Sequence, residues 1–119
     1  MSTLLFIYGT LHPDRAPREI APAARRLAPV GAATIRARLY NLGAYPGAIL
    51  DPAAPPLPGE LFTAPDAQTL AALDAYEDFR PTDLTASLYL RVETTATLPD
   101  GSHITCWVYV YNRALPPAP

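Results

Sequence analysis

The chain has 119 residues, which suits one domain and leaves little room for a second. Half of the residues are hydrophobic and 17% are charged, so the composition predicts a folded protein with a sizeable core and excludes a disordered chain. The net charge is −2 and no basic run occurs, so we expect no nucleic-acid partner.

The start of the chain and its cysteine content carry predictions about location. The first residues lack a basic segment followed by a long apolar one, and no apolar stretch approaches the length of a membrane span. Cys106 is the only cysteine, so no internal disulfide is expected. We therefore expect a cytoplasmic protein with no membrane partner, made of one domain over residues 1–115 and a proline-rich tail over residues 116–119.

The first half of the chain predicts mainly strands. Residues 3–8 are an apolar run that ends at Gly9, which is typical of a buried strand. Residues 16–27 favour a short helix, whose length Pro22 limits. Three further strands are predicted at residues 30–42, 48–50 and 59–62, and the longest alternates with one face made of Ala33, Ile35, Ala37 and Leu39.

The second half predicts a helix followed by a hairpin. A helix is expected over residues 64–76, because Thr63 and Asp66 have the spacing of a capping box and Pro65 suits a first turn. Strands are expected at residues 88–97 and 104–112, and the Asp-Gly pair at 100–101 predicts a tight turn between them. Because strands lie before and after the main helix, the sequence predicts an α+β fold, a small mixed β-barrel flanked by a few α-helices.

The first candidate site is the turn Tyr8-Gly9-Thr10-Leu11. Backbone N–H groups at the end of a buried strand can hold an anion, and glycine permits a ligand to approach closely. A plain turn is the commoner reason for a glycine at such a place, so the motif alone leaves both interpretations open.

The second candidate is Glu77, which shares a helix face with Leu70 and Leu73. Burial at the end of this apolar stripe would raise its pKa into the range useful for proton transfer. Periodicity alone favours a solvated Glu at a frayed helix end, because carboxylates are seldom buried without a partner. Asp74 lies near the same face and is a weaker rival for the same role.

Other polar and aromatic side chains have simpler explanations. His12 and His103 lack the spacing of zinc ligands, and Cys106 alternates with small apolar residues, as a packed core thiol does. Several tyrosines could line a cavity, although packing in the core or at its rim explains most of them. These are Tyr8, Tyr45, Tyr89, Tyr109 and Tyr111.

Taken together, a series of short motifs resembles the gamma-glutamylcyclotransferase-like superfamily, in particular its small gamma-glutamylamine cyclotransferase type and bacterial relatives. Near the N-terminus, Tyr8-Gly9-Thr10-Leu11 resembles the family's Tyr-Gly-Ser/Thr-Leu signature. The remaining motifs follow in the family's order over nearly the whole chain. They are Tyr45-Pro46-Gly47, Pro58-Gly59-Glu60-Leu61-Phe62, Leu73-Asp74-Ala75-Tyr76-Glu77, Tyr89-Leu90-Arg91 and Trp107-Val108-Tyr109-Val110-Tyr111-Asn112.

The resemblance implies a β-barrel flanked by helices, with a cavity at one end and no metal site. It implies that Glu77 is the catalytic acid/base and that substrate is bound by Tyr8, Gly9, Thr10, Leu11 and Tyr89. The chain departs from the family in having Asp78 where a glycine usually follows the catalytic Glu. Residues 79–88 also form a longer stretch than in compact members, so the lid over the pocket and the choice of substrate are expected to differ.

The activity that the resemblance implies is cyclisation of a gamma-glutamyl group to 5-oxoproline, with release of an amine or amino acid. The protein would then be a cofactor-independent C–N lyase or acyltransferase whose partner is a small-molecule gamma-glutamyl substrate. A fold does not establish a function, so a non-catalytic small-ligand binding module, or a plain interaction domain, stays an alternative. The amine half of the substrate and the oligomeric state are left open.

Overall fold

The computed structural model describes residues 3–8, 16–42 and 46–113. Within these ranges the chain forms six strands, two α-helices and one turn of 3-10 helix. This confirms the predicted α+β class. In chain order the elements are β1 (Thr3–Ile7), α1 (Ala21–Ala24), β2 (Ala28–Asn41), β3 (Pro46–Leu50), β4 (Pro56–Ala64), α2 (Ala67–Tyr76), η1 (Leu84–Ala86), β5 (Tyr89–Thr97) and β6 (His103–Tyr111).

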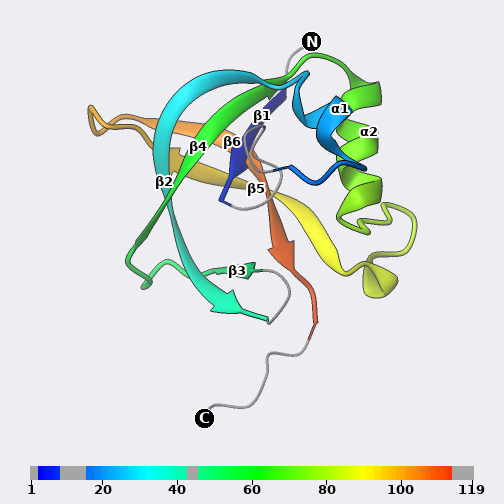
Figure 1. Ribbon diagram of the computed structural model, residues 1–119. Helices are drawn as coiled ribbons and strands as arrows, with labels where there is room; N and C mark the ends of the chain where they lie inside the picture. The colour runs from blue at the N-terminus through cyan, green and yellow to red at the C-terminus, as the bar shows by residue number, and fades with distance from the viewer. Residues whose placement is uncertain (1–2, 9–15, 43–45, 114–119) are drawn as a thin grey trace.

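Five of the strands close into a barrel, as predicted, and β3 is an extra strand on its rim (Figure 1). The strand order is β3-β2-β4-β1-β6-β5, and a further pairing of Thr34 with Thr97 joins β2 to β5 and closes the ring. The pairing of β1 with β6 is parallel, whereas the other pairings are antiparallel. The first strand therefore has a paired neighbour at each edge, β4 at one and β6 at the other.

Alternate residues of the strands face two different hydrophobic clusters. In β1, Phe6 points into the barrel, while Leu5 and Ile7 point toward the helices. In β6, Val108 lies inside the barrel and Tyr109 lies on the helix side. This two-sided burial explains why the first strand reads as a continuous apolar run. The barrel interior is filled by Phe6, Ala33, Ile35, Ala37, Ala48, Leu61, Ala96, Cys106 and Val108.

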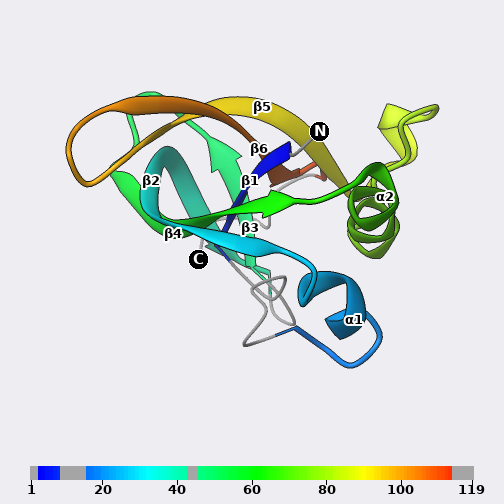
Figure 2. The same ribbon diagram turned by 90° about the horizontal axis from the view of Figure 1, so that it is seen from above.

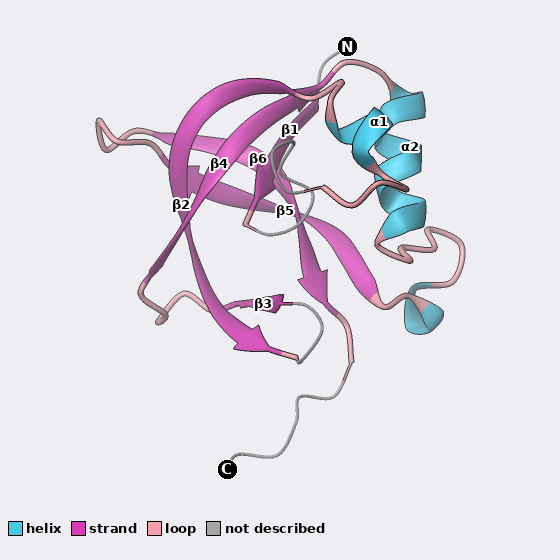
Figure 3. Ribbon diagram, in the orientation of Figure 1, coloured by secondary structure: helices cyan, strands magenta, loops and turns pink. Residues whose placement is uncertain are grey.

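Both helices lie on one side of the barrel, as the view from above also shows (Figures 2 and 3). Helix α1 has only four residues and contains Pro22 in its first turn, in line with the short helix expected there. Leu73 of α2 is fully buried in the helix-side cluster, together with Leu27, which follows α1. The helices therefore cover the face of β1 and β6 that the barrel interior does not use.

The predicted start of the main helix is wrong by three residues. Thr63 and Ala64 belong to β4 and pair with β1, so the helix begins only after Pro65. The N-cap is Asp66, whose carboxylate accepts a hydrogen bond from the Thr69 N–H at 2.7 Å. Pairing with β1 outweighs the local capping pattern because it buries Ala64 in the core.

Leu39 also departs from the predicted pattern of β2. Ala33, Ile35 and Ala37 are buried as the alternation predicts, but Leu39 is 50% exposed. Beyond Arg36, β2 no longer pairs with β4 and pairs only with β3. The strand therefore leaves the closed part of the barrel, and the same face loses its cover.

The turn between β5 and β6 forms as predicted from its Asp-Gly pair. Gly101 has φ +87°, a left-handed value that favours glycine, and its N–H donates to the Leu98 carbonyl at 2.9 Å. Asp100 accepts hydrogen bonds from the N–H and hydroxyl of Ser102. No helix within the described ranges is long and apolar enough to cross a membrane.

Candidate active site

Glu77 ends α2 as its C-cap residue, and the backbone fixes its position. The next residue, Asp78, has φ +56°, and its N–H donates to Ala75 O at 3.1 Å. The N–H of Phe79 donates to Asp74 O at 2.9 Å, which completes a Schellman motif. Glycine adopts this left-handed conformation most readily, and Asp tolerates it better than most other residues.

The Glu77 side chain is half-buried and has neither a hydrogen-bond donor nor an ion-pair partner among the described residues. Burial raises the pKa of its carboxyl group to about 7. A carboxyl group with this pKa can give or accept a proton near neutral pH, as a general acid/base must. The partial burial of the side chain and the Schellman motif at the helix end both argue against the solvated, frayed alternative considered from the sequence.

Glu77 lies close enough to two tyrosines to act on their ionisation. Burial raises the pKa of Tyr8 well above its usual value, and the negative charge of Glu77 raises it further. Burial and a hydrogen bond to Asp74 raise the pKa of Tyr109, and Glu77 adds to this effect. Tyr8 directly follows β1, so the end of α2 lies near the end of the first strand.

The hydroxyl groups of Tyr8 and Tyr89 both bind the backbone of β3. Tyr8 accepts a hydrogen bond from the Ala48 N–H at 3.2 Å and donates one to the Tyr109 carbonyl at 2.6 Å. Tyr89 donates to the Pro46 carbonyl at 2.8 Å. These bonds pair one N–H and one carbonyl of β3, and they connect β3 to β6 through Tyr8 and to β5 through Tyr89. A role for either tyrosine in binding substrate stays a prediction.

The other predicted binding residues, Gly9, Thr10 and Leu11, lie outside the described residues, as does Tyr45. Their proposed contacts with substrate, and the cavity expected at this end of the barrel, therefore stay predictions. The described residues bring together Glu77 and Tyr8, which is the last described residue before this turn.

Sequence analysis missed the role of Asp74, which is bound by two partners. The Arg91 guanidinium donates to both carboxylate oxygens, at 2.8 and 3.1 Å, and the Tyr109 hydroxyl donates to Oδ1 at 2.6 Å. Asp74 therefore is not the free carboxylate that a catalytic rival of Glu77 would be. Its partners come from β5 and β6, so the helix sequence by itself carried no signal for this pairing.

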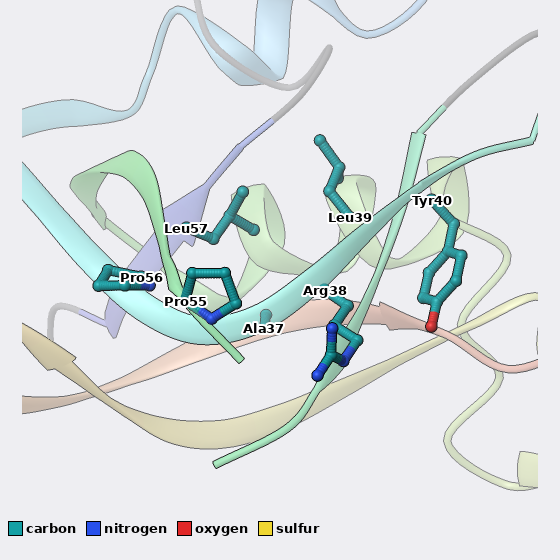
Figure 4. A pocket seen from close by; sticks show the side chains of 7 residues that line it. All are labelled: Ala37, Arg38, Leu39, Tyr40, Pro55, Pro56 and Leu57. Carbon is teal, nitrogen blue, oxygen red and sulfur yellow. The ribbon is translucent and has the colours of Figure 1, made fainter. Parts of the chain in front are cut away.

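A shallow groove of about 380 Å³ lies on another part of the surface (Figure 4). The described residues of its lining include one charged side chain, Arg38, which is paired with Asp51 at 2.7 Å. Among the described residues, the lining of the groove includes none of the predicted site residues and no carboxyl group. It is lined by Ala37, Arg38, Leu39, Tyr40, Pro55, Pro56 and Leu57. The candidate site therefore remains at Glu77.

The barrel, its rim strand and the two helices define an α+β protein with the gamma-glutamyl cyclotransferase-like fold. The sequence profile of the family "Gamma-glutamyl cyclotransferase, AIG2-like" matches residues 5–118, and the chain belongs to this family. A comparison with curated proteins gave no match.

Solved structures show the same fold at low sequence identity. An AIG2-like protein from Mus musculus has a TM-score of 0.73 and 21% identity, over 97% of this chain and 80% of that one. A gamma-glutamyl cyclotransferase has a TM-score of 0.70 and 18% identity, over 93% and 67%. A protein from Arabidopsis thaliana has a TM-score of 0.71 and 22% identity, over 97% and 72%.

Proposed function

We propose that the protein is a gamma-glutamyl cyclotransferase that releases 5-oxoproline from a small gamma-glutamyl substrate, with Glu77 as its acid/base. The observation that supports this most is the state of Glu77. Its carboxyl group is half-buried, lacks a partner among the described residues, has a pKa of about 7 and lies near Tyr8. Membership of the family supports the reaction class.

In the proposed reaction the α-amine of the substrate attacks its own γ-carbonyl carbon. The new bond closes the 5-oxoproline ring, and the bond from the γ-carbon to the leaving amine breaks. The attacking nitrogen loses two protons and the departing amine gains two, so one carboxylate that shuttles between the two nitrogens balances the reaction. The nucleophile and electrophile belong to one molecule, so the reaction as written needs no metal or organic cofactor.

Two further contributions are proposed for the protein. Holding the folded conformer of the substrate can lower the activation barrier of the reaction by several kcal/mol, because the reacting atoms are kept in contact. Backbone N–H groups of Gly9, Thr10 and Leu11 would hold the α-carboxylate or the developing oxyanion. Tyr8 and Tyr89 would shape the site through their hold on β3.

The test is release of 5-oxoproline across a panel of gamma-glutamyl amines, gamma-glutamyl dipeptides and glutathione. With any substrate that the wild type cleaves, Glu77→Gln should fold normally and turn over at least about 100-fold more slowly. Glu93→Gln changes an exposed carboxylate of β5 in the same way and should keep wild-type turnover. Turnover of the wild type should rise with pH through about 7, as the base form of Glu77 appears. Unchanged turnover in Glu77→Gln would remove this residue from the mechanism.

A further inference from the structure

The residues behind Glu77 form a connected polar unit made of Asp74, Arg91 and Tyr109. Arg91 holds both oxygens of the Asp74 carboxylate, and the Tyr109 hydroxyl donates to one of them. Such two-point binding fixes the direction of a carboxylate as well as its distance. Since Asp74 stands one turn before Glu77, the unit fixes the turn of α2 that ends at Glu77.

Aromatic rings restrict the movement of the Arg91 guanidinium. Its central carbon lies 4.8 Å from the ring centre of Trp107 and 5.5 Å from that of Phe79. The Arg91 and Asp74 side chains are only 17% and 12% exposed, so water screens the pair weakly. Packing against the two rings therefore helps to hold the guanidinium in the ion pair, and both charges act strongly on neighbouring groups.

Tyr109 connects this unit to the opposite side of the candidate site. Its hydroxyl donates to Asp74 on α2, while its backbone carbonyl accepts the Tyr8 hydroxyl at 2.6 Å. One residue of β6 thus sets the position of the helix end relative to Tyr8, which leads into the predicted substrate turn.

The charges around Glu77 can be assigned element by element within the described residues. Tyr8 after β1 and Tyr109 on β6 are uncharged at neutral pH, since the pKa of each is raised. On the helix side, Asp78 is paired with Arg80, and Asp74 is paired with Arg91 of β5. Among the described residues, the groups near Glu77 are therefore neutral hydroxyls and paired charges, in agreement with burial as the cause of its raised pKa.

We propose that Asp74, Arg91 and Tyr109 are positioning residues that hold Glu77 in place and keep the charge behind it balanced. This inference rests on the proposed function of Glu77. The balance of charge behind Glu77 predicts an effect on the Glu77 titration that a purely structural role of these three residues does not predict. Removing the negative partner and removing the positive partner must move the titration of Glu77 in opposite directions.

The experiment follows the Glu77 side-chain carboxyl carbon by NMR as pH is varied, in parallel with the pH profile of 5-oxoproline release. The Glu77→Gln variant assigns the signal. Asp74→Asn leaves the Arg91 cation unbalanced, so the titration midpoint should fall by about 0.5–1 pH unit. Arg91→Gln leaves the Asp74 anion unbalanced, so the midpoint should rise by a similar amount. The double variant should return it close to the wild-type value.

Matched controls are available at the other end of the same helix. Arg26 and Asp66 form an exposed ion pair there, and a ten-residue helix separates them from Glu77 by about 15 Å. Asp66→Asn and Arg26→Gln make the same charge changes, and Asn is an equally good N-cap residue. Neither control should move the Glu77 midpoint measurably.

Shifts in the same direction, or no shift beyond that of the controls, would overturn the balanced-charge role. The NMR readout needs no activity. Opposite shifts without any 5-oxoproline release would support the positioning unit and reject the proposed reaction. Release of 5-oxoproline without shifts would support the reaction and reject the positioning unit.

Tyr109→Phe is a milder test, because it removes one hydroxyl and leaves the backbone carbonyl that binds Tyr8. We expect kcat at pH 8 to fall about tenfold in the folded variant, since small displacements of a catalytic group are costly. Near-UV circular dichroism checks that the variant is folded at the assay temperature. Wild-type kcat in this variant would remove Tyr109 from the unit.

Discussion

Two carboxylates three residues apart on α2 lie in opposite surroundings. Asp74 is bound by a guanidinium and a hydroxyl, whereas Glu77 is half-buried without such a partner among the described residues. A buried and fully bound charge is costly to remove, because its partner is then left buried and uncompensated. A buried carboxyl group without a partner instead keeps its proton up to a higher pH, which is what proton transfer near neutrality requires. The difference teaches that position on a helix face does not determine the role of a carboxylate.

The largest effect on stability should come from removing the bound carboxylate of Asp74. Asp74→Ala leaves Arg91 without its anion and should lower the free energy of unfolding by about 3–5 kcal/mol. Glu77→Ala breaks no such pair and should cost less than about 1 kcal/mol at pH 8. Urea unfolding of both variants at pH 8 measures the difference. Equal losses would mean that the two carboxylates are held in the same way.

A smaller effect should appear in the pH dependence of stability. Below pH of about 4.5 the Glu77 carboxyl group is protonated in both the folded and the unfolded chain. Between about 4.5 and 7 the unfolded chain loses this proton while the folded chain keeps it, so the free energy of unfolding falls as pH rises.

Glu77→Gln removes this dependence because its amide does not titrate. The variant should match the wild type near pH 4 and be more stable by about 1–3 kcal/mol above pH 7. Urea unfolding midpoints measured from pH 4 to pH 8 report the difference. A variant less stable than the wild type at pH 8 would show that the charged Glu77 has a stabilising partner in the folded protein.

The smallest effect concerns the backbone that ends the helix at Glu77. Asp78 has φ +56°, so Asp78→Gly should stabilise the protein slightly, whereas Asp78→Ala should cost about 1 kcal/mol. The ion pair of Asp78 with Arg80 is exposed and should add little to this cost. Thermal unfolding of the two variants separates the effect of backbone strain from the effect of losing the ion pair. If both variants lose stability equally, the side chain of Asp78 matters more than its conformation.

Much of the fold could be predicted because its signals are local. The apolar run at residues 3–8, the alternation of the later strands and the Asp-Gly turn each specify an element from neighbouring residues. The errors lie where a distant strand decides. Thr63 joins β4 by pairing with Leu4, and Leu39 is exposed because β2 leaves β4 before reaching it.

The sequence by itself determined the barrel class, the family motifs and the place of Glu77 at the end of the main helix. Only the tertiary structure decided which carboxylate is bound and which is left with a raised pKa. The partners of Asp74 stand 17 and 35 residues away along the chain, on strands that meet the helix only after folding. Helical periodicity puts Asp74 and Glu77 on neighbouring positions, but pairing and burial arise from those long-range contacts.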